Sequence, residues 1–258
     1  MLSTVIFLTL LLASICFFVS TLAMRLPPAR WDLASLSHDN LGRRISAVLL
    51  EVFLQYKVIR DRPIVGILHA LVMWGFFAFI LVTIEHLWLG FTGLRHAPAA
   101  STFYRTFVAI WSLAVLVGIG GLSFRRFVSR PRALGAELSV TSGVVAALIA
   151  TLMITYLLDW GALDPDTVAW RTNWWVHTIS LLLMLAVIPR SKHLHLILAP
   201  FAIFFRPDTT SQMRALDLEN DDFGMIHFQD LRLKRLLDLN ACVECGRCTD
   251  RCPANATG

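Results

Sequence analysis

Long apolar stretches alternate with short polar ones along this chain. Five of the stretches could each cross the hydrocarbon core of a bilayer, which takes about 20 helical residues. They are Leu2–Met24, Ile64–Leu89, Thr106–Phe124, Ser139–Leu158 and Thr172–Ile188. Because backbone groups in lipid must pair within their own segment, all five are predicted to be helices. The fifth run continues through a basic patch into further apolar residues, so we expect one helix over about 172–197.

The polar segment between the first two runs carries a helical pattern of its own. Its apolar residues recur at helical spacing and are Ile45, Val48, Leu49, Val52, Phe53, Tyr56 and Ile59. Charged and amide side chains lie mostly between them. The pattern predicts an amphipathic helix that lies on the membrane surface or supports a partner domain.

The character of the chain changes after the last apolar stretch. We expect a membrane domain over 1–205, an acidic linker over 206–229, and a cysteine-bearing segment over 230–258. A short helix is predicted over Asp230–Leu239, where leucines repeat just before the cysteines.

Composition agrees with a membrane protein. Of the 258 residues 56% are hydrophobic and 16% are charged, whereas soluble domains carry about 25% charged residues. The fold class expected is therefore an all-α, five-helix membrane bundle. The net charge is +5, but no soluble basic face or aromatic platform accompanies it, which argues against nucleic-acid binding.

Lys and Arg are distributed unevenly between the loops. Segment 25–62 carries seven of them and segment 125–132 carries four, whereas 90–105 carries two and 159–171 carries one. Cytoplasmic loops are the basic ones. The N-terminus is therefore predicted outside and the C-terminal segment in the cytoplasm.

Four cysteines crowd together near the C-terminus. Cys242, Cys245, Cys248 and Cys252 form a C-x2-C-x2-C-x3-C run followed by Pro253. This is the ligand run of bacterial ferredoxins, which predicts a [4Fe–4S] cluster. The alternatives are a zinc knuckle or a set of free thiols, although zinc sites rarely use this run with a trailing proline.

The fourth cysteine leaves two possibilities open. In two-cluster ferredoxins the last cysteine of such a run ligates the other cluster. Either Cys252 closes a lone cluster, or the native chain continues past Gly258 with a second run. The pattern favours continuation, with further iron–sulfur domains on the same chain or on another subunit.

Histidines occur at two matching depths in the second and fifth runs. Seventeen residues separate His69 from His86, roughly 25 Å of helix, and eighteen separate His177 from His195, roughly 27 Å. Such a set could hold two b-type haems, one between His69 and His195 and one between His86 and His177. Singly, each histidine could equally be a packed or interfacial residue.

Helical phase separates stronger from weaker candidates. Eighteen residues return His195 to the face of His177, whereas His193 lies about 160° away. His86 lies about 100° from the face of His69, which makes it the weakest of the four.

With these residues in view, positions 1–205 resemble the haem-b subunit of respiratory nitrate reductase and the related subunit of heterodisulfide reductase. In that family the last helix carries two histidines eighteen apart, the second in a Pro-x-Ser-basic-x-x-His stretch. Here that stretch is Pro189–His195, and His177 precedes its last histidine by eighteen residues. The haem histidine that opens the family's second helix is matched by His69.

One position departs from the family pattern. The nitrate reductase subunit has a second histidine about ten residues after the first, where this chain has Phe79. An outer haem must therefore use His86 or be absent. The tail is similar to heterodisulfide-reductase-type iron–sulfur proteins, whose bacterial members include proposed electron-transfer-flavoprotein:menaquinone oxidoreductases.

The resemblance implies an electron carrier in the bacterial cytoplasmic membrane. Electrons would pass between a soluble cytoplasmic donor such as a flavoprotein, the cluster, one or two b haems and a quinone. Glu85, at the outer end of the second run, is the candidate proton-exchanging group, with an ordinary interfacial carboxylate as its alternative. Two rival functions are a haem-less membrane anchor for an iron–sulfur enzyme and a proton-translocating subunit.

Overall fold

The fold is known from a computed structural model. It describes residues 2–27, 36, 40–93, 102–131, 134, 138–164, 167–207, 231, 233–250 and 252–257. Helices, turns and irregular segments account for all of them, without a strand. The predicted all-α class is confirmed over these ranges.

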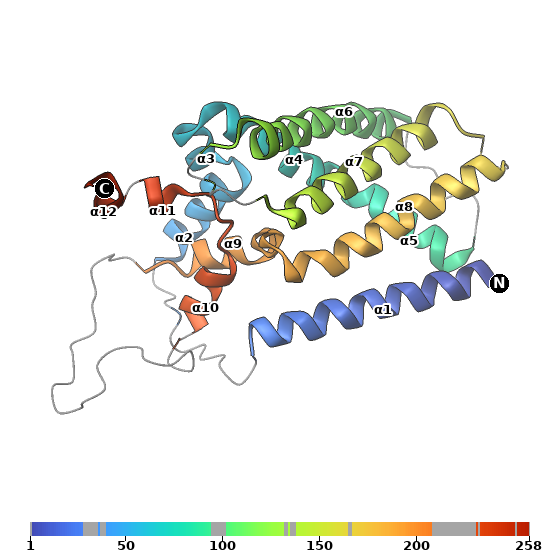
Figure 1. The fold of residues 1–258 in the computed structure, drawn as a ribbon. Coiled ribbons are helices and arrows are strands. Elements are labelled where there is room, and N and C mark those ends of the chain that lie inside the picture. Colours follow the sequence, from blue (N-terminus) through green and yellow to red (C-terminus); the bar gives the residue numbers. More distant parts are fainter. Residues whose placement is uncertain are drawn as a thin grey trace.

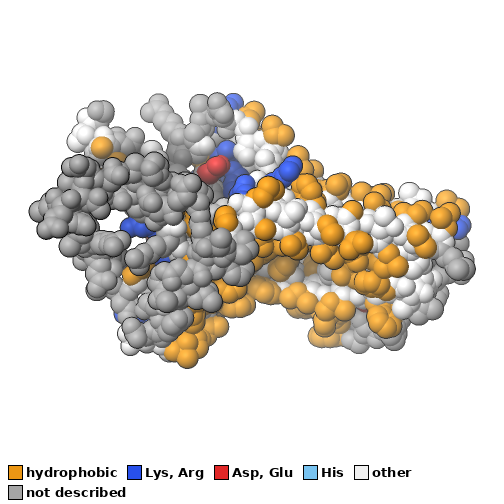
Figure 2. Space-filling view, turned by 90° about the horizontal axis from the view of Figure 1, so that it is seen from below, with side chains coloured by type: hydrophobic (Ala, Val, Ile, Leu, Met, Phe, Trp, Pro, Cys, Tyr) orange, Lys and Arg blue, Asp and Glu red, His pale blue; other side chains and the backbone are white. Residues whose placement is uncertain are grey.

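Four helices are long and apolar enough to cross a membrane, and a bent pair makes a fifth candidate span. The four are α1 (Leu2–Arg25), α6 (Thr102–Phe124), α7 (Val140–Gly161) and α8 (Val168–Val187), and the pair is α4 (Pro63–Ala78) with α5 (Ile80–Thr92). They lie alongside one another in one bundle (Figure 1). Apolar side chains cover much of the bundle surface seen in Figure 2, as contact with lipid requires.

The centre of the bundle is packed by side chains from three candidate spans, namely the bent pair α4–α5, α6 and α7. α6 lies between α4 and α7, and α8 contacts both α7 and α1. The core that these three spans share contains Phe79, Val108, Ala109, Val115, Met153 and Tyr156. Glycines in α4 and α6 let those two helices approach closely, a device that lipid-embedded helices use often.

The second predicted helix is bent rather than straight. α4 and α5 meet at Phe79 with an angle of 45° between them. The hydroxyl of Tyr104 donates a hydrogen bond of 2.5 Å to the carbonyl oxygen of Ala78, directly before the bend. An inserted side-chain donor is a known cause of such kinks, and here it comes from α6.

The single helix expected over about 172–197 is divided in the structure. α8 ends at Val187 and is followed by two 3-10 turns, η6 (Ile188–Arg190) and η7 (Lys192–Leu194). α9 (His195–Phe204) then begins a new helix. Pro189 has no amide hydrogen, and Ser191 adopts an extended conformation between the two turns.

The amphipathic segment before the second span is also divided. It forms α2 (Leu41–Val48), the π-helix η3 (Leu49–Phe53) and α3 (Tyr56–Asp61), with a break at Gln55. Arg44 of α2, expected on a polar face, is buried and donates to the carbonyl oxygens of Phe204 and Arg206. The segment therefore packs against the end of α9 as well as bordering the spans.

The cysteine-bearing segment contains α10 (Leu233–Asn240), α11 (Arg247–Asp250) and α12 (Pro253–Thr257). α10 corresponds to the short helix expected over 230–239. Its leucines join a second core with residues from the start of the chain and from α9, namely Leu26, Leu36, Leu194, Leu198, Leu233, Leu236 and Leu237. Of the expected linker only Arg206 and Pro207 lie within the described residues, and its acidic stretch lies outside them.

Candidate functional site

His69 and His195 face each other at the end of the bundle where α10 and the cysteines lie. His69 comes from the first half of α4, and His195 opens α9. The centres of their rings are 6.1 Å apart. Because the break after α8 redirects the chain, His193 also lies nearby, with its ring centre 6.2 Å from that of His195.

We call His69 and His195 the inner pair. Hydrogen bonds give both of these histidines the same tautomer. Nδ1 of His195 lies 2.7 Å from the carbonyl oxygen of Lys192, and Nδ1 of His69 lies 3.0 Å from Oε1 of Gln55. Both partners are acceptors, so each Nδ1 carries the hydrogen and each Nε2 keeps its lone pair. Metal-ligating histidines are held in this way by their other ring nitrogen.

The spacing of the two rings in the inner pair fits a bis-histidine metal site. A metal–imidazole bond is about 2.0 Å long and a ring nitrogen lies about 1.1 Å from the ring centre, so two rings on one metal have centres about 6 Å apart. The 6.1 Å separation of His69 and His195 matches this spacing.

The outer pair, His86 of α5 and His177 of α8, is arranged differently. The two ring centres are 4.6 Å apart, which is too close for a metal between them. Nδ1 of His177 is hydrogen-bonded to the hydroxyl of Thr155, so its Nε2 is the nitrogen left for a ligand. In His86 it is Nε2 that forms a hydrogen bond, of 2.8 Å, with the hydroxyl of Thr178. Its ring also stacks on Trp174. In this arrangement the outer pair does not fit a bis-histidine haem.

Glu85 lies beside a polar cluster near the end of the bundle that holds His86 and His177. It is within electrostatic range of Arg105 and Asp159, which form an ion pair of 3.2 Å. Asp159 also accepts a hydrogen bond of 2.6 Å from Trp170. A partly exposed carboxylate among such groups can exchange protons with its surroundings.

The four cysteines of the predicted cluster motif are free thiols. Cys242 and Cys248 are exposed, and Cys245 and Cys252 are half-buried. No three metal-ligating side chains converge on one point within the ranges that the structure describes. Four thiols in one short loop are nonetheless the donor set of a [4Fe–4S] cluster, and the left-handed Glu244 and Gly246 turn the backbone between the first three.

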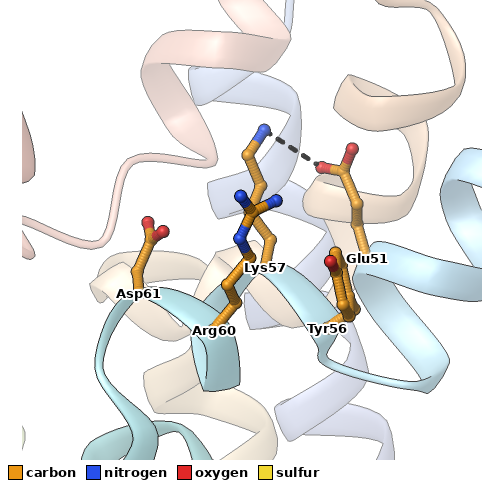
Figure 3. A pocket seen from close by; sticks show the side chains of 5 residues that line it. All are labelled: Glu51, Tyr56, Lys57, Arg60 and Asp61. Carbon is orange, nitrogen blue, oxygen red and sulfur yellow. Dashed lines mark ion pairs between the residues drawn. The ribbon is translucent and has the colours of Figure 1, made fainter.

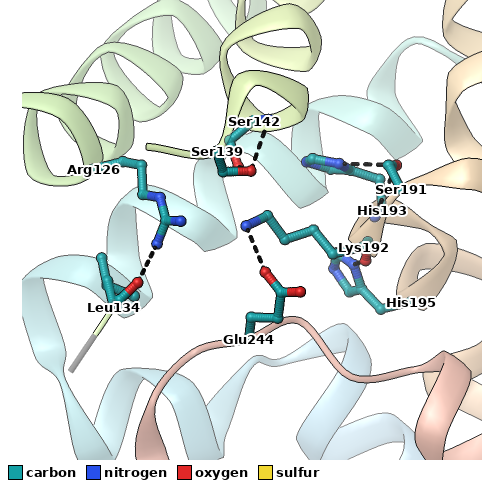
Figure 4. A network of polar contacts seen from close by, with 9 residues as sticks. All are labelled: Arg126, Leu134, Ser139, Ser142, Ser191, Lys192, His193, His195 and Glu244. Atoms are coloured by element: carbon teal, nitrogen blue, oxygen red, sulfur yellow. Dashed lines mark hydrogen bonds and ion pairs between the residues drawn. The ribbon is translucent and has the colours of Figure 1, made fainter. Parts of the chain in front are cut away.

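Polar contacts hold this cysteine loop against the membrane domain. Lys192 pairs with Glu244 at 3.5 Å, as Figure 4 shows, and lies between His193 and the loop. Arg62 donates a hydrogen bond of 3.3 Å to the carbonyl oxygen of Cys245. Asp61 pairs with Arg247 at 3.5 Å. Arg62 and Lys192 are close in sequence to His69 and His195, so the loop is attached beside the inner pair.

An open depression of about 420 Å³ lies at the end of the molecule that carries the cysteine loop. It is lined by Glu51, Tyr56, Lys57, Arg60 and Asp61 (Figure 3). Arg206 binds Glu51 through two hydrogen bonds of 2.8 and 2.6 Å. These bonds, with a smaller contribution from Lys57, hold the pKa of Glu51 below its usual value of 4.5. The depression therefore carries paired charges of both signs.

Sequence reasoning located the histidines and cysteines but not the residues that orient them. Gln55 lies fourteen positions before His69 in a segment that reads as an uninterrupted amphipathic helix. In the sequence Arg62 is only one member of a basic loop, Lys192 is the basic position of the Pro189–His195 stretch, and Asp61 carries no signal of its own. Nothing in the sequence marks these residues or Gln55 as the contacts that orient the site.

Comparison with known proteins gives two distant relatives. The chain is 27% identical to a "Probable iron-sulfur-binding oxidoreductase FadF" of Bacillus subtilis over 99% of its own length and 41% of that protein. It is 25% identical to an "EtfAB:quinone oxidoreductase" of Syntrophomonas wolfei over 86% of its own length and 36% of that protein. The chain is a distant homologue of iron–sulfur and quinone oxidoreductases. It spans about two fifths of the length of these relatives.

No protein-family model and no solved structure matches the chain. The names of both relatives describe oxidoreductases, and the first also describes iron–sulfur binding. Together with the cysteine run and the apolar helices, they indicate a distant relation to membrane-associated iron–sulfur and quinone oxidoreductases. Haem is named in neither relative.

Proposed function

We propose that this chain carries electrons between a soluble cytoplasmic donor and membrane quinone. A [4Fe–4S] cluster on the cysteine loop and a b-type haem between His69 and His195 would be its carriers. The name of the second relative supports a flavoprotein donor and a quinone acceptor. The observation that carries the proposal is the attachment of the cysteine loop beside a histidine pair of metal-site spacing.

The residues of the chain would have separate tasks in this function. Cys242, Cys245 and Cys248 would ligate the cluster, and Cys252 would bind either the same cluster or a second one. The haem would supply a one-electron carrier inside the apolar bundle. His69 and His195 would hold it through Nε2, since Nδ1 of each is engaged.

Quinone reduction consumes two electrons and two protons, so a proton donor must lie near the quinone. Glu85 is our candidate, because it lies in a span near Arg105 and Asp159 and is partly exposed. The uneven distribution of Lys and Arg supports an N-terminus outside the cytoplasmic membrane and a cysteine loop inside. The outer end of the bundle would then hold Glu85.

The first test is a reduced-minus-oxidised visible spectrum of the purified chain with haem quantified per chain. One haem per chain that is lost in His69→Leu and kept in His193→Leu is the expected result. His193 is the control, because it lies two residues before His195, its Nδ1 contacts the hydroxyl of Ser191 at 3.3 Å, and we do not assign it as a ligand.

Other outcomes would be equally informative. Two haems per chain would mean that His86 and His177 also ligate, which requires His86 to release Thr178 and the two rings to move apart. A haem-free chain that still binds its iron–sulfur cluster would favour the membrane-anchor function instead.

A further inference from the structure

Gln55 has a backbone conformation that its residue type rarely adopts. It sits between η3 and α3 with φ 53° and ψ 21°, in the left-handed region. Its side chain is almost fully buried, with 5% exposed. Left-handed non-glycine residues persist only where the surrounding structure holds them, and they cluster at functional sites.

The carboxamide of Gln55 can point in only one direction. Its Nε2 donates to the carbonyl oxygen of Val52 over 2.6 Å and also to the sulfur of Met73. Both of these partners are acceptors, so the nitrogen must face them and Oε1 must face His69. The 3.0 Å contact with Nδ1 of His69 is therefore a hydrogen bond in which His69 donates.

We infer that Gln55 is a positioning residue of the inner haem site, which fixes the tautomer and ring orientation of His69. The inference rests on the proposed haem between His69 and His195. A buried acceptor on the far ring nitrogen makes the ligating nitrogen more basic and so favours the oxidised metal. Gln55 would thus set both the retention and the midpoint potential of this haem.

The two inner ligands differ in how they can be tested. The acceptor for His195 is the backbone oxygen of Lys192, which no substitution removes. The acceptor for His69 is a side chain, so it can be exchanged without altering either ligand. Gln55 lies between η3 and α3, whereas His69 lies in α4, so its contact also ties the amphipathic segment to α4.

Two variants of the full chain, purified in detergent, test the inference. Gln55→Glu offers a charged acceptor, which strengthens the bond to His69, and should lower the haem midpoint potential while haem is retained. Gln55→Leu removes the acceptor and should raise the midpoint and weaken haem binding about 10- to 100-fold. The readouts are potentiometric titration of the haem absorbance and haem per chain.

Trp74→Phe is the matched control. Trp74 of α4 donates a hydrogen bond of 2.7 Å to the carbonyl oxygen of Phe53, so it anchors the same segment to the same helix without touching His69. It should leave the midpoint unchanged. A midpoint shift in Trp74→Phe equal to those of the Gln55 variants would reduce Gln55 to a structural anchor and overturn the inference.

Two further outcomes separate this inference from the proposed function. If the wild-type chain binds haem and both Gln55 variants keep its midpoint and haem content, only the role of Gln55 is overturned. If the wild-type chain binds no haem, the proposed function fails and the role of Gln55 fails with it.

Discussion

At the scale of single residues, the contact between Glu51 and Arg206 joins η3 to the end of α9. The two hydrogen bonds run in parallel from one guanidinium to one carboxylate, the strongest geometry for such a pair. The same bonds lower the pKa of Glu51 and raise that of Arg206, so both partners favour the charged state. The side chain of Glu51 is the less exposed of the two, at 19% against 40% for Arg206, so its charge depends more on the pairing.

Glu51→Gln should therefore destabilise the folded chain by about 1–2 kcal/mol at pH 7. A carboxyl with a lowered pKa contributes stability above its unfolded value and loses that contribution as the pH falls through the folded value. The deficit should accordingly shrink as the pH falls below 4.5, the usual value for Glu51. Thermal unfolding in detergent at several pH values measures this.

Lys57→Met is the control for that measurement. Lys57 reaches the same carboxylate at 3.5 Å, but its side chain is 55% exposed. An exposed ion pair contributes about 0.5 kcal/mol or less. A Lys57 variant as unstable as the Glu51 variant would show that Arg206 is not the dominant partner.

At the scale of elements, the close contact between α4 and α6 fixes the position of His69 in the bundle. A Cβ on Gly118 would lie 2.7 Å from the carbonyl oxygen of Leu68, the residue before His69. A backbone atom cannot move aside as the end of a flexible side chain can. α4 and α6 would have to separate, and His69 would move with α4.

Gly118→Ala should thus destabilise the bundle by about 1–3 kcal/mol through overpacking and lower the haem content of the purified chain. Gly120→Ala is the matched control, because nothing lies within 4 Å of a Cβ there. Both variants gain the same helix propensity, so their difference isolates the packing term. Equal stability and equal haem content in the two variants would contradict this account of α4 and α6.

The breaks in the helices are the part of the fold that could not be predicted from the sequence. Apolar length predicted the spans well, because a segment in lipid has few alternatives to a helix. The bend at Phe79 depends on Tyr104 of another helix, and the break at Gln55 depends on Met73 and His69. Such tertiary contacts leave no periodic signal in the segment that they interrupt.

The helical phase argument that favoured His195 over His193 rests on a geometry that the structure does not have. The choice of His195 over His193 assumed an unbroken helix from His177. In the structure the chain breaks at Ile188–Leu194, and His195 nevertheless opens the helix that faces His69. The role of each histidine as a ligand stays a prediction.

At the scale of the whole molecule, apolar packing and polar contacts together join the cysteine loop to the bundle. The apolar core between α10 and α9 fixes one end of the segment, and the polar contacts near Asp61, Arg62 and Lys192 fix the loop itself. Of the two ion pairs, Asp61–Arg247 is the more buried, with side chains 23% and 28% exposed, whereas Glu244 is 71% exposed. Arg247 and Glu244 both lie inside the cysteine run, so the greater burial of Asp61–Arg247 makes it the pair expected to hold the loop more strongly.

Reversing one charge of that pair should release the loop, and reversing both should restore it. Asp61→Arg or Arg247→Asp alone places like charges together, and we expect hydrogen exchange over residues 242–250 to accelerate about five-fold, a cost of about 1 kcal/mol. The double variant recreates the pair with its charges exchanged and should return exchange close to the wild-type rate. Lys192→Met, which removes only the exposed pair with Glu244, should change exchange less than two-fold. If the double variant exchanges as fast as either single variant, the loop is held by the apolar core of α10 rather than by charge.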